Sequence, residues 1–176
     1  MKKVYLDIDD TLYDTYSYLG SLVMLSLGSS YISGKNIYEL MVEDKNVKNL
    51  CMRVLSDYSK IPTRAYASDL VKLLKGKYEV VLCSMYVFEC ERIAKEKLAS
   101  KLGVECILVP YDKSTGKSAI DMSDGIFVDD SIKLLKSSNA QRKILIGSKP
   151  TDGFWSGDCV GDCMELLVTL LWEEIN

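Results

Sequence analysis

The stretch that decides the fold is the opening one, Val4-Tyr5-Leu6-Asp7-Ile8-Asp9-Asp10-Thr11. A short apolar run rich in strand-forming residues stops here at three carboxylates within four positions. Side chains alternate along a strand, so Asp7 and Asp9 point to one side and Ile8 points to the other. Two acids on one side repel each other unless a cation lies between them. A solvated turn is the alternative interpretation, because Asp is common in turns.

The rest of the chain alternates short apolar runs with segments of helical periodicity. After the first strand at 3–8, strands are predicted at 78–83, 106–109, 125–128 and 143–146. Helices are predicted at 62–75, with Pro62 in the first turn, and at 87–102, 131–138 and 160–173. Such alternation predicts an α/β fold, a three-layer, doubly wound parallel sheet.

Residues 12–61 differ from the remainder because they contain helical spacing and no convincing strand. Helices are predicted from about 12 to 27, 37 to 41 and 47 to 58. We therefore expect a catalytic core made of residues 1–11 and 62–176, with a small helical cap at 12–61 inserted after the first strand. A cap over the strand ends would exclude water from a site there.

The amino-acid composition excludes several kinds of catalytic and metal site. The 176 residues contain no histidine, which excludes Ser-His-Asp and Cys-His catalysis and histidine-based zinc sites. The net charge of -3 gives no reason to expect duplex nucleic acid as a partner. No apolar run approaches the ~18 residues of a membrane span, so we expect a cytoplasmic protein without membrane attachment. The six cysteines lack a zinc-like CxxC pair and suit buried free thiols.

Polar side chains follow the predicted strands where each one ends. They are Asp7 and Asp9, then Ser84, then Lys113, then Asp129 and Asp130. Ligands of open α/β sheets bind beyond the carboxyl ends of the strands, so these groups are expected to form one site. Convergent carboxylates suit Mg²⁺, which takes a few protein oxygens together with water and substrate phosphate. The four acids are therefore the candidate metal ligands.

These residue types suit phosphoryl transfer. A cation that keeps Asp7 ionised makes it a nucleophile, and an aspartyl-phosphate divides one hard displacement into two easier ones. Asp9 is expected to have the higher pKa of the two acids and to exchange protons with the leaving oxygen and the attacking water. Ser84 and Lys113 are expected to bind phosphoryl oxygens.

The motifs resemble those of the haloacid dehalogenase-like phosphohydrolases. Asp7-Ile8-Asp9-Asp10-Thr11 matches their DxDx(T/V) motif, and Ile126-Phe127-Val128-Asp129-Asp130 is similar to their apolar run followed by two acids. Ser84 after Val80-Val81-Leu82-Cys83 is similar to their second motif. The resemblance implies Asp7 as nucleophile and Asp9 as acid and base. It also implies Mg²⁺ held by Asp7, the main-chain carbonyl of Asp9, and Asp129.

Within that superfamily the chain most resembles the 5'(3')-deoxyribonucleotidases, which also carry a helical cap after the first motif. Their third-motif lysine lies in a stretch similar to Asp112-Lys113-Ser114. Two departures are Asp10, where the family usually has glycine, and Ser84-Met85-Tyr86, where it has Thr-Ser-Pro. The long gap to Asp129 leaves Lys117 as a rival to Lys113, which we prefer, for the phosphate.

The expected activity is thus magnesium-dependent hydrolysis of a small phosphorylated metabolite, such as a (deoxy)nucleoside monophosphate. One or two tyrosines of the cap region would stack on the base, and the others are expected to lie in the core of the cap. Alternatives on the same site are a phosphomutase and a phosphatase for sugar phosphates or phosphoproteins. Two alternatives from other classes are a catalytically silent binding domain and a receiver-like domain phosphorylated on Asp7. The first has no physical need for packed acids, and the second would not need the helical insertion.

Overall fold

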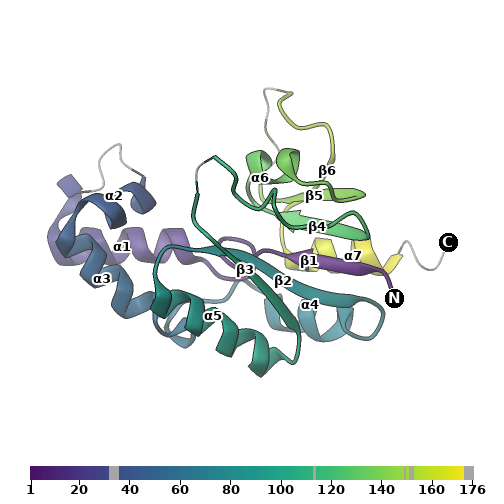
Figure 1. The fold of residues 1–176 in the computed structure, drawn as a ribbon, viewed down its shortest axis with the longest axis horizontal. Helices are drawn as coiled ribbons and strands as arrows, with labels where there is room; N and C mark the ends of the chain where they lie inside the picture. Colours follow the sequence, from purple (N-terminus) through teal and green to yellow (C-terminus); the bar gives the residue numbers. More distant parts are fainter. Residues whose placement is uncertain (32–35, 113, 149, 151–152, 173–176) are drawn as a thin grey trace.

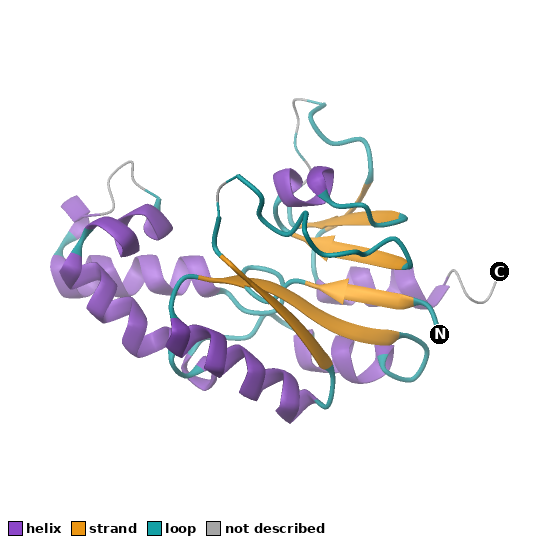
Figure 2. Ribbon diagram, viewed as in Figure 1, coloured by secondary structure: helices purple, strands orange, loops and turns teal. Residues whose placement is uncertain are grey.

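A single parallel sheet of six strands organises the chain (Figures 1 and 2). The computed structural model describes residues 1–31, 36–112, 114–148, 150 and 153–172. The strands are β1 (Lys3–Leu6), β2 (Glu79–Tyr86), β3 (Glu105–Pro110), β4 (Gly125–Asp129), β5 (Arg142–Ile146) and β6 (Asp158–Val160). Their order in the sheet is β3-β2-β1-β4-β5-β6, and every neighbouring pair is parallel. The α/β fold with a doubly wound parallel sheet is therefore confirmed.

The chain reverses its direction of winding between β1 and β4, which lie side by side in the sheet. From β1 it proceeds outward through β2 to β3, then crosses to β4 on the other side of β1. A crevice forms at such a point beyond the carboxyl ends of the two strands. Asp7 follows β1 and Asp129 ends β4, so both acids lie at this crevice.

Seven described helices alternate with the strands along the chain or follow them. They are α1 (Thr15–Leu27), α2 (Ile37–Glu43), α3 (Lys45–Leu55), α4 (Ala67–Leu74), α5 (Glu89–Leu102), α6 (Ile132–Ser137) and α7 (Cys163–Trp172), with 3₁₀ turns η1 (Ser29–Tyr31) and η2 (Tyr58–Lys60). None of these described helices is both long and apolar enough to cross a bilayer.

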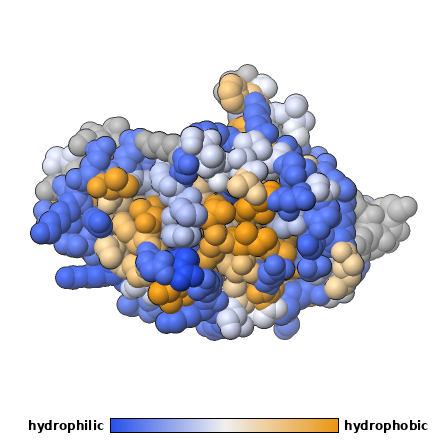
Figure 3. Space-filling model, in the orientation of Figure 1, coloured by the Kyte–Doolittle hydropathy of each residue, from blue (hydrophilic) through white to orange (hydrophobic). Residues whose placement is uncertain are grey.

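The two faces of the sheet are covered unequally. Side chains from α4, α5 and α7 pack in one core with Val4 and Leu6 of β1. Tyr5 points to the opposite face, where the short helix α6 and the loop before β4 supply the covering residues, among them Leu135 and Met122. Figure 3 shows apolar side chains gathered over β2 and β3 near the centre of the face in view. Residues 114–124 thus cover part of this face through Ile120 and Met122 and bring Lys117 to the end of β1.

The helices α1, α2 and α3 lie beyond the carboxyl ends of the strands, at the left of Figure 1. Local side-chain bonds set their starts: Asn36 accepts from the amide of Tyr38 at the start of α2, and Asp44 does the same for Asn46 and Val47 in α3. Their buried residues continue the core of the sheet, because Leu19, Val23 and Cys51 belong to the same cluster. The division into a core and a cap at residues 12–61 stays a prediction.

Three local predictions were wrong. Pro62 does not start a helix, because its carbonyl accepts from the amide of Asp14 and the helix α4 begins only at Ala67. Ser84 lies inside β2, which runs on to Tyr86 by pairing with β3. The strand β6 was not predicted, and it places Val160 in the sheet where the last helix was expected to begin; that helix, α7, begins only at Cys163.

Candidate active site

Asp7, Lys117 and Asp129 form a buried ionic cluster at the end of β1 and β4. The Lys117 ammonium lies 2.5 Å from Asp7 Oδ1 and 2.6 Å from Asp129 Oδ2. The side chains of Lys117 and Asp129 are 1% and 0% exposed, so their charges interact with little screening from water. The main chain fixes both acids, because the Asp7 amide donates to Val128 and Asp129 Oδ1 accepts from the Ser131 amide.

The acids also offer a set of ligands for a hard cation. Asp7, Asp129 and Asp130 each present a carboxylate oxygen, and these three oxygens lie within 4.8 Å of one another. Opposite ligands of octahedral Mg²⁺ lie ~4.2 Å apart, so a small closure of this set would fit the ion. The Asp9 carboxylate is not part of this set, and its proposed metal contact through the main-chain carbonyl stays a prediction.

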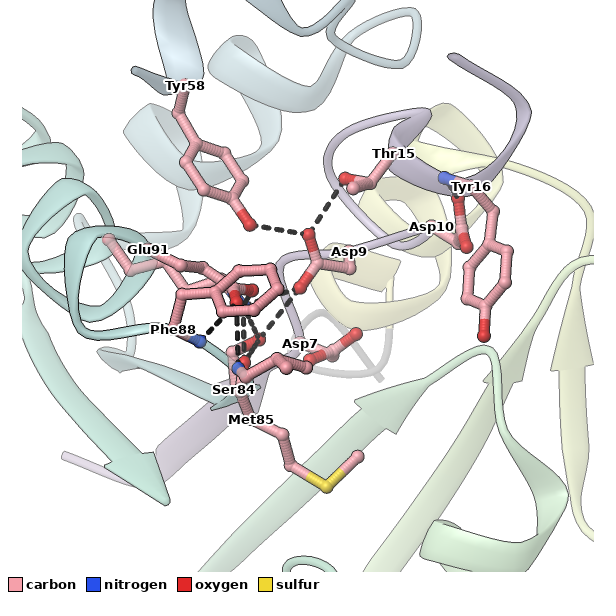
Figure 4. Close-up of polar contacts among 12 residues, drawn as sticks. Asp7, Asp9, Asp10, Thr15, Tyr16, Tyr58, Ser84, Met85, Phe88 and Glu91 are labelled. Atoms are coloured by element: carbon pink, nitrogen blue, oxygen red, sulfur yellow. Dashed lines mark hydrogen bonds and ion pairs between the residues drawn. The ribbon is translucent and has the colours of Figure 1, made fainter. Parts of the chain in front are cut away.

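Asp9 lies in a different environment, where four donors surround its carboxylate. Figure 4 shows Tyr58 and Thr15 at one of its oxygens. The Tyr58 hydroxyl donates to Oδ1 over 2.7 Å and the Thr15 hydroxyl donates to the same oxygen over 2.8 Å. The Lys95 ammonium lies 2.6 Å from Oδ2, and the Ser84 hydroxyl lies 3.3 Å from it. The donors come from η2, α1, α5 and β2, so four separate elements fix this side chain.

These surroundings separate the pKa values of the two acids. Burial raises the pKa of Asp7 to about 7, with Lys117 opposing the rise and Asp129 adding to it. Burial also acts to raise the pKa of Asp9, but the Lys95 charge and the hydrogen bonds from Lys95, Tyr58 and Thr15 outweigh it and lower this pKa. This order is the reverse of the expected one, which assumed a cation at Asp7 and did not include Lys95.

Asp10 explains one departure from the haloacid dehalogenase-like motif. Its φ is +54°, in the left-handed region that glycine adopts without strain and that Asp tolerates better than most residues. The Asp10 carboxylate accepts a hydrogen bond of 2.9 Å from the Tyr16 amide in the first turn of α1. The aspartate therefore caps the helix that follows while keeping the backbone turn.

The remaining predicted phosphate ligands differ in their positions. Ser84 is 1% exposed and lies between Asp9 and Lys95, with its hydroxyl 3.1 Å from the Lys95 ammonium. Lys113, which the sequence analysis preferred, lies outside the described residues. Lys117, the rival, is the lysine that contacts Asp7.

A cavity of about 540 Å³ opens above these groups. Asp7, Asp9, Ser84, Lys117, Asp129 and Asp130 line it from the sheet side. Tyrosine rings line it elsewhere: Tyr38 of α2 stacks on Tyr111, with centroids 5.5 Å apart and planes 10° apart. Tyr16 meets Tyr38 edge to face at 4.5 Å. The cavity thus combines a charged floor, formed by the acids and Lys117, with an aromatic wall formed by Tyr16, Tyr38 and Tyr111.

Sequence reasoning missed Lys95, Glu91, Tyr58 and Thr15 as partners of the site. One signal was present, since Lys95 lies on the face of α5 that also buries Glu91, Ala94 and Leu98. A lysine on an apolar helix face is rarely buried without a charged partner. Its partner Asp9 lies 86 positions away, and only the fold brings the two together.

Comparison with known proteins identifies the fold. No protein-family model and no curated protein sequence matches the chain. Solved structures do: a haloacid dehalogenase-like hydrolase of Burkholderia xenovorans is similar at 16% identity and a TM-score of 0.64, with 99% of each chain covered. The HAD-hydrolase YfnB of Bacillus subtilis bound to magnesium gives 11% and 0.66, covering 97% of this chain and 98% of its own. A HAD-superfamily hydrolase of subfamily IA from Geobacter sulfurreducens gives 11% and 0.60, covering 97% and 96%. The chain therefore has the fold of the haloacid dehalogenase-like hydrolases.

Proposed function

We propose that this protein is a magnesium-dependent phosphomonoesterase that acts through an aspartyl-phosphate on Asp7. The observation that carries the proposal is the Lys117 ammonium placed between Asp7 and Asp129 at the floor of the cavity. A lysine at the nucleophile can bind an oxygen of the transferred phosphoryl group, where negative charge is spread in the transition state. The fold supports a hydrolase of this kind without identifying the substrate.

Asp7, Asp129 and Asp130 would hold the magnesium ion, which supplies positive charge beside the phosphoryl oxygens. The Asp7 carboxylate attacks phosphorus, and the bond from phosphorus to the leaving oxygen breaks. Water then attacks the phosphorus of the aspartyl-phosphate and releases inorganic phosphate. The phosphoryl oxygens contact Lys117 and Ser84 in both steps.

Asp9 is the carboxylate available for proton transfer, since it lines the same cavity as Asp7. The leaving oxygen needs a proton in the first step, and the attacking water gives one up in the second. The lowered pKa makes the ionised form of Asp9 its resting state. The base role in the second step therefore needs no prior change of charge, whereas the acid role requires Asp9 to be protonated first.

The aromatic wall supports a (deoxy)nucleoside monophosphate as the substrate. Tyr16, Tyr38 and Tyr111 gather on one side of the cavity, and flat rings of this kind stack on nucleobases. The volume of about 540 Å³ lies within the range of pockets for small molecules. A sugar phosphate has no flat ring that could stack on these side chains.

Release of inorganic phosphate from a panel of phosphoesters tests the proposal. We expect turnover of nucleoside monophosphates with Mg²⁺, loss of turnover with a chelator, and recovery when Mg²⁺ is added back. Asp7→Asn should abolish turnover and acid-stable labelling of the protein by phosphate, while the exposed control Asp69→Asn should change neither. Normal turnover by Asp7→Asn would overturn the nucleophile assignment.

The same panel separates the alternatives. A phosphomutase releases little inorganic phosphate, and a sugar-phosphate or phosphoprotein phosphatase prefers those esters over nucleotides. Tyr38→Leu should raise KM for a nucleoside monophosphate and leave KM for glycerol phosphate unchanged. An equal change for both esters would exclude base stacking on Tyr38. A silent binding domain would bind phosphoesters without turnover.

A further inference from the structure

Lys95 is a fully buried cation that the proposed reaction does not use directly. Its side chain is 0% exposed, and it is absent from the residues that line the cavity. The ammonium contacts Asp9 Oδ2 at 2.6 Å, Glu91 Oε1 at 2.8 Å and the main-chain carbonyl of Met85. The Ser84 hydroxyl also accepts from it over 3.1 Å, so four acceptors surround its three N–H donors. Lys95 therefore has a fixed position and no open donor for a substrate.

Groups on α5 and β2 hold Lys95 in place. Glu91 and Lys95 are one turn apart on α5, and Glu91 Oε2 accepts from the amide of Val87 over 2.8 Å. Glu91 thus holds both Lys95 and the segment that leaves β2. Met85 belongs to β2 itself, next to Ser84. The position of the ammonium is consequently set by the backbone of the strand that carries the phosphate-binding serine.

On the side of Asp9, the four donors are divided between its two oxygens. Tyr58 and Thr15 hold Oδ1, whereas Lys95 and Ser84 contact Oδ2. Without Lys95, the Ser84 hydroxyl at 3.3 Å would be the remaining donor at Oδ2. The carboxylate would then pivot about Oδ1, which Tyr58 and Thr15 still hold. A displacement of about 1 Å at a reacting group can lower a rate ~100-fold.

We propose that Lys95 is a positioning residue that fixes the orientation of the Asp9 carboxylate for proton transfer. The expected loss of kcat rests on the proposed phosphomonoesterase function. The expected displacement of the Asp9 carboxylate rests on geometry alone. Glu91 contributes to this positioning, because its carboxylate contacts the Lys95 ammonium at 2.8 Å. Nothing in the sequence around the first motif indicates such a residue, since the nearest lysines there are Lys2 and Lys3.

A double-mutant cycle with Asp9 tests whether Lys95 acts through that residue. Lys95→Met should lower kcat ~100-fold and leave KM unchanged, because Lys95 does not touch the substrate. In an Asp9→Asn background the same substitution should change kcat by no more than about threefold. Lys95→Arg should recover part of the loss. Equal losses in both backgrounds would overturn the proposal, because they indicate a purely structural role.

The matched control is Lys97→Met, which removes an exposed lysine from the same helix and should leave kcat unchanged. If Lys95→Met does not fold, Lys95→Gln replaces it in the cycle, since it keeps an N–H donor while removing the charge. Circular dichroism verifies the fold of each variant before kinetics.

A crystal structure of the Lys95 variant separates this proposal from the proposed function. We expect the Asp9 Oδ2 atom to leave Ser84 while the bonds of Oδ1 to Tyr58 and Thr15 persist. An Asp9 carboxylate unmoved in the variant would overturn the positioning role. If the wild-type protein releases phosphate from no phosphomonoester, the proposed function fails, and this structural outcome still decides the role of Lys95.

Discussion

Lys117→Met is the substitution for which the structure predicts the largest loss of stability. The ammonium of Lys117 lies 2.5 Å from Asp7 and 2.6 Å from Asp129, and both acids are buried. Methionine keeps a similar shape but removes the charge, so two carboxylates would face each other in a site of low dielectric constant. Removal of one partner from a buried ion pair costs ~3–5 kcal/mol of the free energy of unfolding.

For a chain of this length each kcal/mol corresponds to about 2–4 °C in Tm, so a fall of ~6–20 °C is expected. Urea unfolding at pH 7.5 with a chelator, monitored by circular dichroism, measures the difference in free energy. Lys97→Met, which removes an exposed lysine, should remain within about 0.5 kcal/mol of wild type.

Magnesium should reverse much of this loss, since a cation bound between the acids replaces the missing charge. The rise in Tm on adding Mg²⁺ should therefore be larger for Lys117→Met than for wild type. A loss below ~1 kcal/mol in the chelator would refute the reasoning, because it would mean that Asp7 and Asp129 do not depend on Lys117 for compensation.

Two further predictions concern ionisable groups near and away from the site. Burial raises the pKa of Asp10 to about 6, so its folded form binds a proton more tightly than the unfolded chain does. Protonated Asp10 contributes fully to stability below about pH 4, and this contribution is lost as pH rises through 6. Asp10→Asn keeps an acceptor for Tyr16 and cannot ionise, so above pH 6 its free energy of unfolding should exceed that of wild type by ~1–3 kcal/mol. Urea unfolding in a chelator at pH 4 and pH 7.5 measures the gain, and a difference that does not change with pH would contradict it. Burial also raises the pKa of Cys51 and Cys83 to about 12, so neither thiol should react with a disulfide reagent at pH 8 until urea unfolds the protein; prompt labelling of either one in the folded state would contradict this.

The sequence was most informative where one short pattern determines the structure. The apolar run before Asp7 predicted the central strand, because strand propensity is local. The strand β1 ends at Leu6 and not at Ile8 as predicted, so Asp7 and Asp9 follow the strand and do not alternate along it. The apolar run before Asp129 likewise predicted β4, which this residue ends. Parallel strands that end in polar residues can be recognised without knowing their neighbours.

Longer-range features were not predictable in this way. The strand β6 has three residues, Asp158–Val160, and forms by pairing with β5 rather than by its own apolar pattern. The contact of Lys117 with Asp7 depends on long-range packing, and the hydrogen bonds that Asp112 accepts from Ser114 and Thr115 precede it in the chain. The contact of Lys95 with Asp9 depends on how α5 packs on the sheet, and the sequence shows only the charge on a buried face.

The Asp9 carboxylate accepts hydrogen bonds from two parts of the chain that lie far apart in the sequence. Tyr58 and Thr15 approach it from the helical insertion, whereas Ser84 and Lys95 approach it from the sheet layer. Any hinge-like opening between the two would strip one oxygen of its donors while leaving the other engaged. The pKa of Asp9 therefore depends on the distance between these two groups of donors. A movement that separates them would change proton transfer as well as access to the site.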